Sequence, residues 1–354
     1  MKSKIRQSNI ELLRCIAMLM VLVLHADFKS FGAPGSIDIM SYPINSTVRV
    51  LLEMLSIVAV NVFILISGWF GIKPSLKGFT KFAFQCLFFS VGVYVSTILF
   101  GLSTFSFKGI AECFAIKADD YWFIPSYICL YFFSPVLNTF LDNAEEKTIK
   151  RIIICFFVFQ TLYSFIGNGG AFLMKGYSAL SFIGLYLLSG FVRRYVNISV
   201  YNNLIYLYGY LAISIVLTCT YLFFVYNHCE SIAFRLILYS NPLVVLSALL
   251  LLIYFTTLNF TSIVVNRISL SCFAVYLLHC NPNLFGAVFI QSIRNISSVN
   301  AFLSFLMIFS VVILWFITAI LIDQIRIILW NKIATTKVCR YLLDNNRCER
   351  NFNL

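Results

Sequence analysis

The stretch Ile10–Ala26, IELLRCIAMLMVLVLHA, is almost wholly apolar, yet it carries Arg14 and His25. Eleven residues at 3.6 per turn make about three turns, so the two side chains project from nearly the same helix face, roughly 16 Å apart. Ionisable residues inside a membrane span are costly and mark functional sites. The pair therefore predicts a membrane helix with an anion anchor at one depth and proton chemistry at another.

The composition of the whole chain agrees with a multispan membrane protein. Of its 354 residues, 60% are hydrophobic and 11% are charged, and the mean hydropathy is +0.90. Soluble domains carry about 25% charged residues. A net charge of +12 would also suit nucleic acid, but the basic residues lie in short loops and a tail. That distribution orients membrane proteins, so we expect a lipid bilayer and no nucleic acid as partner.

The eleven cysteines predict neither a disulfide framework nor a metal site. Most fall in apolar segments, and the chain contains no CxxC pair and no metal-ligand spacing. We therefore expect no metal and no permanently bound cofactor. The first apolar run is followed by His25, Asp27 and Lys29 rather than by a small-residue cleavage site, so we interpret it as a permanent span.

About ten segments are long and apolar enough to cross a bilayer, which needs about 20 residues. They are roughly 9–27, 48–70, 79–101, 121–141, 152–168, 178–196, 204–226, 236–258, 268–290 and 301–325. The predicted fold is thus an all-α integral membrane protein. An even count places both termini on one side.

Loop charge assigns that side. With the amino terminus inside, eighteen Lys and Arg residues, Lys81 and Arg326 among them, fall in inner segments and seven in outer ones; Arg14 completes the 26. This asymmetry predicts cytoplasmic termini. We divide the chain into a multispan domain, residues 1–330, and a basic cytoplasmic tail, residues 331–354.

In this orientation Arg14 lies near the cytoplasmic end of the first span and His25 near the other end. A cytoplasmic donor with phosphates and a long arm, such as coenzyme A, could reach from one to the other. Arg14 suits phosphate, neutral His25 suits general-base work, and Glu11, one turn from Arg14, could orient the guanidinium. Two simpler interpretations stay open: Arg14 snorkels to inner headgroups, and His25 lies at the outer interface.

Further polar side chains within the spans each leave two interpretations open. Glu53 is functional or ion-paired, and Asn61 joins helices or lines a site. Trp122 belongs to an interfacial belt or to a substrate platform. His279 precedes Pro282, which should break its helix, so the imidazole serves either a transfer site or its own broken helix. Arg193 and Arg194 anchor an inner boundary or meet the donor phosphates.

Taken together, these stretches resemble the acyltransferase family three of integral membrane acyltransferases, which includes bacterial O-acetyltransferases of surface polysaccharides. The resemblance runs in order from about residue 5 to residue 325. Its landmarks are IELLRCIAMLMVLVLH ending in His25, VNVFILISGWF with Asn61 to Gly68, YWFIPSYICLYFFSP with Trp122 and Tyr127, LLSGFVRR with Gly190 to Arg194, and ISLSCFAVYLLH ending in His279. Two features depart from the family pattern. Glu11 replaces the commoner Asp, and Arg193 and Arg194 are adjacent rather than spaced.

The resemblance implies an acyl-coenzyme A-dependent O-acyltransferase of a bacterial inner membrane. It would move an acyl group, acetyl in the first instance, to a hydroxyl of a cell-surface polysaccharide or its lipid-linked precursor. The implied residues are His25, Arg14 and Glu11 for catalysis, Arg14, Arg193 and Arg194 for the donor, and Glu53, Asn61, Trp122, Tyr127 and His279 for the substrate.

Two rival functions stay open. The first is a polysaccharide flippase, exporter or polymerase without acyl chemistry; the Arg-x10-His spacing and the late Y-L-x-H stretch argue against it. The second is a small-molecule acyltransferase of the same family.

Overall fold

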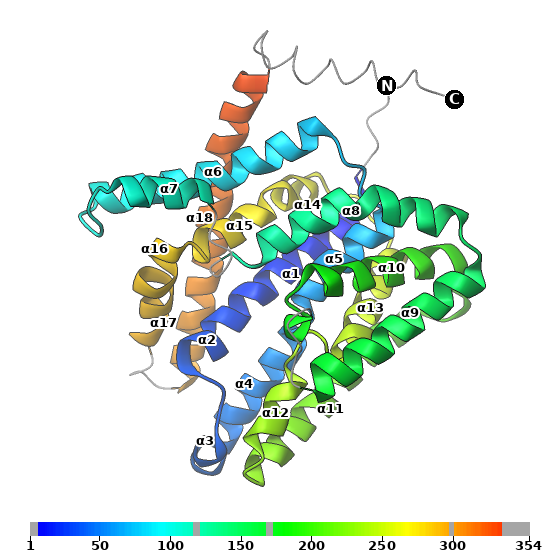
Figure 1. Ribbon diagram of the computed structural model, residues 1–354. Coiled ribbons are helices and arrows are strands. Elements are labelled where there is room, and N and C mark those ends of the chain that lie inside the picture. The colour runs from blue at the N-terminus through cyan, green and yellow to red at the C-terminus, as the bar shows by residue number, and fades with distance from the viewer. Residues whose placement is uncertain (1–5, 116–120, 168–172, 297–300, 335–354) are drawn as a thin grey trace, which may run out of the picture.

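The computed structural model describes residues 6–115, 121–167, 173–296 and 301–334, and within these ranges every regular element is a helix (Figure 1). The α-helices are α1 Ser8–Ala26, α2 Phe28–Phe31, α3 Ser36–Ser41, α4 Pro43–Ser56, α5 Ala59–Phe70, α6 Leu76–Leu99, α7 Phe107–Ala115, α8 Phe123–Asn143, α9 Glu146–Gln160, α10 Ala179–Tyr195, α11 Asn203–Tyr226, α12 Glu230–Leu236, α13 Pro242–Thr257, α14 Ile263–Ile268, α15 Cys272–His279, α16 Pro282–Leu284, α17 Gln291–Arg294 and α18 Ala301–Ala334. π-Helical turns span Thr161–Ile166 and Phe285–Ile290, and 3-10 turns span Met174–Gly176, Ile198–Val200 and Ser269–Ser271.

Within the described ranges, seven helical stretches are long and apolar enough to cross a membrane. They are Ser8–Phe31, Pro43–Phe70, Leu76–Leu99, Phe123–Asn143, Glu146–Ile166, Asn203–Tyr226 and Phe302–Ala334. A bent pair of helices gives an eighth if it is one span. Two other predicted segments form the shorter helices α10 and α13, of 17 and 16 residues. The helical membrane class is confirmed, while the count of ten and the orientation stay predictions.

The bent pair contains the predicted break at Pro282. The segments Ile263–His279 and Pro282–Arg294 meet at 59°. Pro282 has no backbone N–H and occupies the first position of α16, and the side chain of Asn281 caps that helix by accepting from the Asn283 amide. The predicted helix break is therefore confirmed. Because of it, His279 is the last residue of α15, inside the protein.

Helix α1 lies at the centre of the bundle, where α4, α5, α13, α14, α15 and α18 all contact it (Figure 1). In the most apolar part of the stretch that begins with α1, 61% of the residues are buried, whereas the corresponding share in α18 is 17%. The interior position of α1 places the Arg14–His25 face among other helices. This packing does not favour the two simpler interpretations, which expect Arg14 and His25 to face lipid headgroups.

The crossing of α5 and α10 depends on Gly68. A Cβ at this position would lie 2.3 Å from the backbone oxygen of Tyr186, so only glycine permits the approach. The Ser189 hydroxyl on α10 donates a hydrogen bond to the Leu65 carbonyl oxygen on α5 at 2.5 Å. Small residues and hydroxyls serve close helix packing in membranes. Gly68 thus has a packing role.

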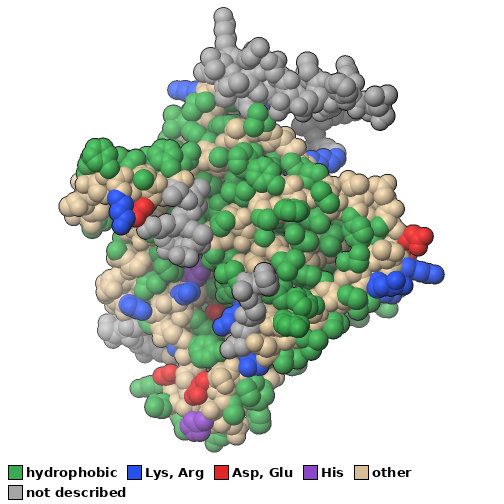
Figure 2. All heavy atoms as spheres, in the orientation of Figure 1, with side chains coloured by type: hydrophobic (Ala, Val, Ile, Leu, Met, Phe, Trp, Pro, Cys, Tyr) green, Lys and Arg blue, Asp and Glu red, His purple; other side chains and the backbone are tan. Residues whose placement is uncertain are grey.

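The outer surface is that of a membrane protein. Hydrophobic side chains cover much of the face in Figure 2, with few charged side chains among them. On α18, Phe302, Leu314 and Leu321 are more than 60% exposed. Helix α18 continues to Ala334, four residues past the predicted boundary at residue 330, and the division of the chain into domains stays a prediction. Residues 335–354, the rest of the predicted tail, lie outside the described ranges.

Candidate active site

A pocket of about 380 Å³ opens beside α1. Helix α1 lines it with Arg14, Met18, Val21 and His25, whose spacing of four, three and four residues follows one helix face. The predicted common face is therefore present. The other walls come from α5, α6, α8, α15 and α18 and from the residues just before α1, α8 and α13.

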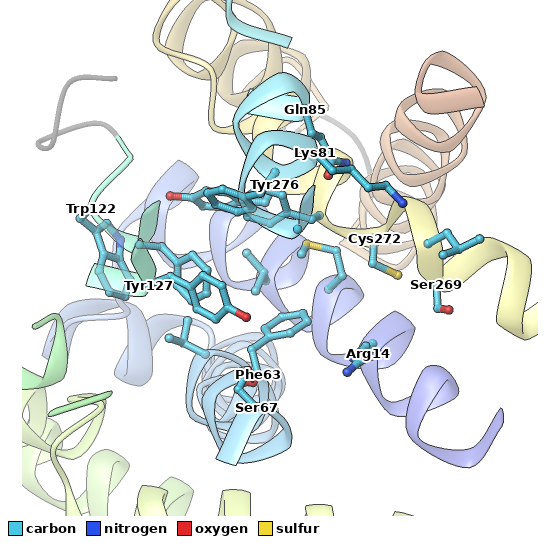
Figure 3. Close-up of a pocket in the computed structure, with 18 of the residues that line it drawn as sticks. Arg14, Phe63, Ser67, Lys81, Gln85, Trp122, Tyr127, Ser269, Cys272 and Tyr276 are labelled. Atoms are coloured by element: carbon cyan, nitrogen blue, oxygen red, sulfur yellow. Dashed lines mark hydrogen bonds between the residues drawn. The ribbon is translucent and has the colours of Figure 1, made fainter. Parts of the chain in front are cut away.

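One side of the pocket is strongly basic. Arg6, Arg14, Lys81 and Arg326 line it, together with the polar side chains of Gln85 and Ser269. Figure 3 shows Arg14 and Lys81 on the same side of the pocket with Ser269 between them, and Trp122 on the opposite side. Four cationic side chains from three separate segments suit an anion with several charges, such as a phosphate-bearing donor.

Glu11 positions two of these cations. Its Oε1 accepts a hydrogen bond from Arg14 Nη1 at 2.8 Å, and its Oε2 lies 3.5 Å from Arg6 Nη1. Glu11 is buried, and it does not line the pocket. The predicted contact with Arg14 is present. The carboxylate thus orients guanidinium groups and does not face the pocket where a substrate would react.

Arg326 combines a structural partner with a free donor. Its Nε and Nη2 donate to the carboxylate of Asp323 at 2.8 and 2.7 Å, and both residues are fully buried. Gln85 Nε2 donates to the same carboxylate at 3.2 Å. Arg326 Nη1 is buried without a hydrogen-bond partner in the described chain. A buried polar group without a partner points to a ligand or an ion at this position.

His25 meets His279 at the pocket wall. His25 lines the pocket, and its Nδ1 lies 2.9 Å from His279 Nε2. His279 Nδ1 donates to the carbonyl oxygen of Val275, one turn back on α15, at 2.6 Å. The rings of Phe285 and Phe289 pack against the two imidazoles at 5.3 and 5.4 Å. The sequence left two roles open for His279, a transfer site or its own broken helix. The structure shows a hydrogen bond to its own helix and a contact with His25, while His279 itself does not line the pocket.

Cys280 also contacts this pair. Its Sγ lies 3.2 Å from His279 Nε2 and 3.6 Å from His25 Nδ1. The three ligand atoms lie within 4.8 Å of one another, close enough to share a metal ion. The sequence predicted no such grouping, because metal spacing is local along the chain, whereas these residues come from α1 and from the end of α15.

Aromatic side chains form the wall opposite the basic side. Trp122 and Tyr127, two of the predicted substrate residues, line the pocket beside Tyr239 and Tyr276. The Trp122 and Tyr239 rings stack with centroids 6.0 Å apart. Tyr276 lies one turn before His279, and its hydroxyl is buried without a hydrogen-bond partner in the described chain. Aromatic faces of this kind pack well against apolar chains and against the apolar faces of rings, and the Tyr276 hydroxyl adds a candidate donor to the wall.

The chain matches a known protein family over most of its length. A sequence model of a family described as an acyltransferase domain matches residues 7–324, which spans α1 to most of α18. The chain belongs to acyltransferase family three. No curated protein and no solved structure gives a significant match. Membership identifies the protein as a membrane acyltransferase.

The structure places two predicted donor-binding residues of this acyltransferase elsewhere. Arg193 and Arg194 line a second pocket with Trp69, Phe70 and Gly71, and neither lines the pocket of Arg14. Arg193 donates to the Trp69 carbonyl oxygen, while Arg194 pairs with Asp142 and the Gly190 carbonyl oxygen. Their guanidinium groups therefore bond to groups near the C-terminal ends of α5, α8 and α10. The donor role that the family resemblance implied for them therefore lacks geometric support.

Three predicted substrate residues of the acyltransferase, Glu53, Asn61 and His279, do not line the pocket. Asn61 Nδ2 donates to the Tyr239 carbonyl oxygen at 3.1 Å, so it fastens a wall residue rather than facing a substrate. Glu53 is 5% exposed and does not line the pocket. Its Oε2 has no hydrogen-bond partner in the described chain.

Three of the four pocket cations, Arg6, Lys81 and Arg326, were interpreted from the sequence only as charges that orient the protein in the membrane. For Arg326 a signal existed: an acid and a base three residues apart, Asp323 and Arg326, in a long apolar run are typical of a buried pair. Lys81 carries no comparable signal, because its position in the first turns of α6 matches ordinary interfacial anchoring.

Proposed function

We propose that the protein is an O-acyltransferase that moves an acetyl group from acyl-coenzyme A to a hydroxyl of a cell-surface polysaccharide or its lipid-linked precursor. One observation supports this most: a single pocket holds both a cluster of four cations and His25. The cluster suits the phosphates of the donor. The imidazole lies about three helical turns, roughly 16 Å, from Arg14, and this separation suits the length of a pantetheine arm.

The donor would bind with its phosphates at Arg14, Lys81 and Arg326, the last through the free Nη1. Preorganised cations recognise phosphate without reorganising when it arrives. Glu11 and Asp323 keep two of the guanidinium groups in place. The arm would then extend past Met18 and Val21 and place its thioester near His25.

At the other end, His25 would take the proton of the acceptor hydroxyl as that oxygen attacks the thioester carbonyl carbon. The new C–O bond forms and the C–S bond breaks. The departing thiolate receives the proton from His25, which leaves the free thiol of coenzyme A, the acyl ester and neutral imidazole. The unpartnered hydroxyl of Tyr276 is a candidate donor to the carbonyl oxygen as negative charge develops there.

Binding measurements with purified protein test the donor. Lys81→Gln should weaken acetyl-coenzyme A binding, whereas Lys77→Gln, an exposed lysine one turn earlier on α6 that does not line the pocket, should not. Acetylpantetheine, which lacks the nucleotide phosphates, should bind weakly and with equal affinity to the parent protein and to both variants. Equal affinity of the parent for the two donors would contradict the phosphate site.

The acceptor requires an experiment in cells. We expect a deletion strain to lose an acetyl ester from its surface glycan, detected by mass and by NMR, and plasmid-borne parent to restore it. Restoration by His25→Ala would contradict the proposal. An unchanged glycan together with a lost acetylated small molecule would favour a small-molecule acceptor. An intact ester but a missing glycan at the surface would favour a flippase or exporter. Cell fractionation of the parent tests the proposed bacterial inner-membrane location.

A further inference from the structure

The hydrogen bonds of the two histidines form a chain that starts at a backbone carbonyl. The Val275 oxygen can only accept, so His279 Nδ1, 2.6 Å away, must carry a hydrogen. In neutral His279 the other nitrogen, Nε2, then holds a lone pair. That lone pair faces His25 Nδ1 at 2.9 Å, so His25 Nδ1 must carry a hydrogen in its turn. In neutral His25 this leaves the lone pair on Nε2.

The opposite arrangement is unfavourable. A hydrogen on His279 Nε2 pointing at His25 would leave a lone pair on His279 Nδ1 facing the Val275 oxygen at 2.6 Å. Two acceptors in contact at that distance repel, and His279 is 0% exposed, so water cannot relieve the contact. The break before Pro282 keeps His279 at the end of α15, and the Phe289 ring holds its imidazole from the side. One carbonyl therefore decides the tautomers of both rings.

We infer that His279 is a positioning residue that holds His25 in the tautomer in which Nε2, and not Nδ1, is the catalytic base. The part about base catalysis rests on the proposed function; the tautomers follow from the geometry alone. When His25 Nε2 takes the acceptor proton, the ring becomes a cation. Its Nδ1–H bond to His279 Nε2 then becomes charge-assisted and stronger. His279 thus stabilises the protonated base without itself taking a proton.

A metal ion shared by His25, His279 and Cys280 is the competing use of this cluster. Two nitrogens on one tetrahedral zinc ion, each bound at 2.0–2.1 Å, lie about 3.3 Å apart. The observed separation of 2.9 Å is instead that of an N–H···N hydrogen bond. The geometry favours a hydrogen bond between the two imidazoles, and metal binding is the alternative outcome of the test.

Nitrogen-15 NMR of histidine-labelled protein reads the tautomers directly, because protonated and lone-pair nitrogens differ in chemical shift. The chain has three histidines, so the spectrum is simple. His228 is exposed in a turn at φ 57°, and His228→Asn removes its signals with a residue that tolerates this conformation. We expect both remaining histidines to carry hydrogen on Nδ1. Hydrogen on His25 Nε2 would overturn the inference, whatever the enzyme's activity.

Two substitutions at position 279 separate positioning from folding. His279→Gln offers Oε1 as an acceptor to His25 Nδ1–H, whereas His279→Leu offers none. For Leu we expect His25 to lose its Nδ1–H signature and kcat to fall by about 100-fold or more, with donor affinity unchanged. Gln should restore the signature and most of kcat. Equal kcat in the Gln and Leu proteins, when both bind donor normally, would show that His279 does not position His25.

Metal analysis of purified protein completes the test. We expect no stoichiometric zinc in the parent, and no change in the His25 signals when a chelator is added. The opposite result would be one equivalent of zinc that is lost in Cys280→Ser, together with His25 signals that shift on chelation. It would show that the cluster is a metal site and would overturn the hydrogen bond between the two imidazoles. Donor binding measured on the same samples tests the proposed function independently of either result.

Discussion

His25 Nδ1 on α1 and His279 Nε2 on α15 lie 2.9 Å apart, although 254 positions separate the two residues in the chain. The contact joins the first predicted span to the ninth. It exists because α15 ends at His279 and because α1 packs at the centre of the bundle. The same imidazole of His25 lines the pocket that Arg14 enters three turns earlier. The candidate base and the candidate phosphate-binding arginine therefore line one cavity.

The first prediction concerns His25. Replacing it with alanine should lower acyl transfer by about 100- to 10,000-fold, the usual contribution of a general base. His228→Asn is the matched control, because it removes an exposed histidine outside the pocket and should leave transfer at the parental rate. Rates should be measured on equal amounts of purified, folded protein. Parental activity in His25→Ala would remove His25 from the mechanism.

The second prediction compares arginines of the two pockets. Arg14→Lys should raise the donor dissociation constant, because a point charge cannot reproduce the planar guanidinium fork. Arg194→Gln, in the second pocket, should leave that constant unchanged. Titration with acetyl-coenzyme A checks both variants. A large effect at Arg194 with none at Arg14 would restore the donor role implied by family resemblance and move the phosphate site to the second pocket.

The third prediction separates stability from binding at Arg326. Arg326→Met leaves Asp323 buried and unpaired and should cost about 3–5 kcal/mol of stability. The double variant Asp323→Leu, Arg326→Met removes both charges and should regain most of that loss. Thermal unfolding in detergent measures the stability. Donor affinity should stay low in both variants, since the free Nη1 is absent. Parental affinity in the double variant would limit Arg326 to a structural role.

The fourth prediction concerns orientation. With cytoplasmic termini, a reporter fused after Leu354 should be active only in a cytoplasmic format. A cysteine at exposed Ser41, before α4, should react with a membrane-impermeant maleimide in intact cells. A cysteine at exposed Lys147, at the start of α9, should react only after lysis. The reverse pattern would turn the protein over and place the basic side of the pocket outside.

The fifth prediction concerns Gly68. Gly68→Ala should destabilise the protein, because the added Cβ would meet the Tyr186 backbone at 2.3 Å and force α5 and α10 apart. We expect a lower unfolding temperature and reduced insertion. Gly92→Ala is the control, since a Cβ there meets no atom within 4 Å. Equal stability of the two variants would mean that the α5–α10 crossing adapts easily.

By itself, the sequence determined those features that depend on local periodicity and composition. The helix repeat placed Arg14 and His25 on one face, Pro282 predicted the break after His279, and hydropathy predicted a helical membrane protein. Order along the chain sufficed for the family, because five landmarks recur in sequence. None of these inferences requires knowledge of how one helix packs against another.

Only the tertiary structure decided which charges meet. It brought Lys81 and Arg326 to the pocket of Arg14 and put Arg193 and Arg194 in a separate pocket. It left Asn61 and Glu53 out of the lining of the Arg14 pocket, with Asn61 bonded to the Tyr239 backbone. A basic residue at a helix end has the same local sequence signature whether it anchors to headgroups or lines a cavity. The difference arises from helix packing, which depends on side chains far apart in the chain. The pairing of His25 with His279 was decided in the same way.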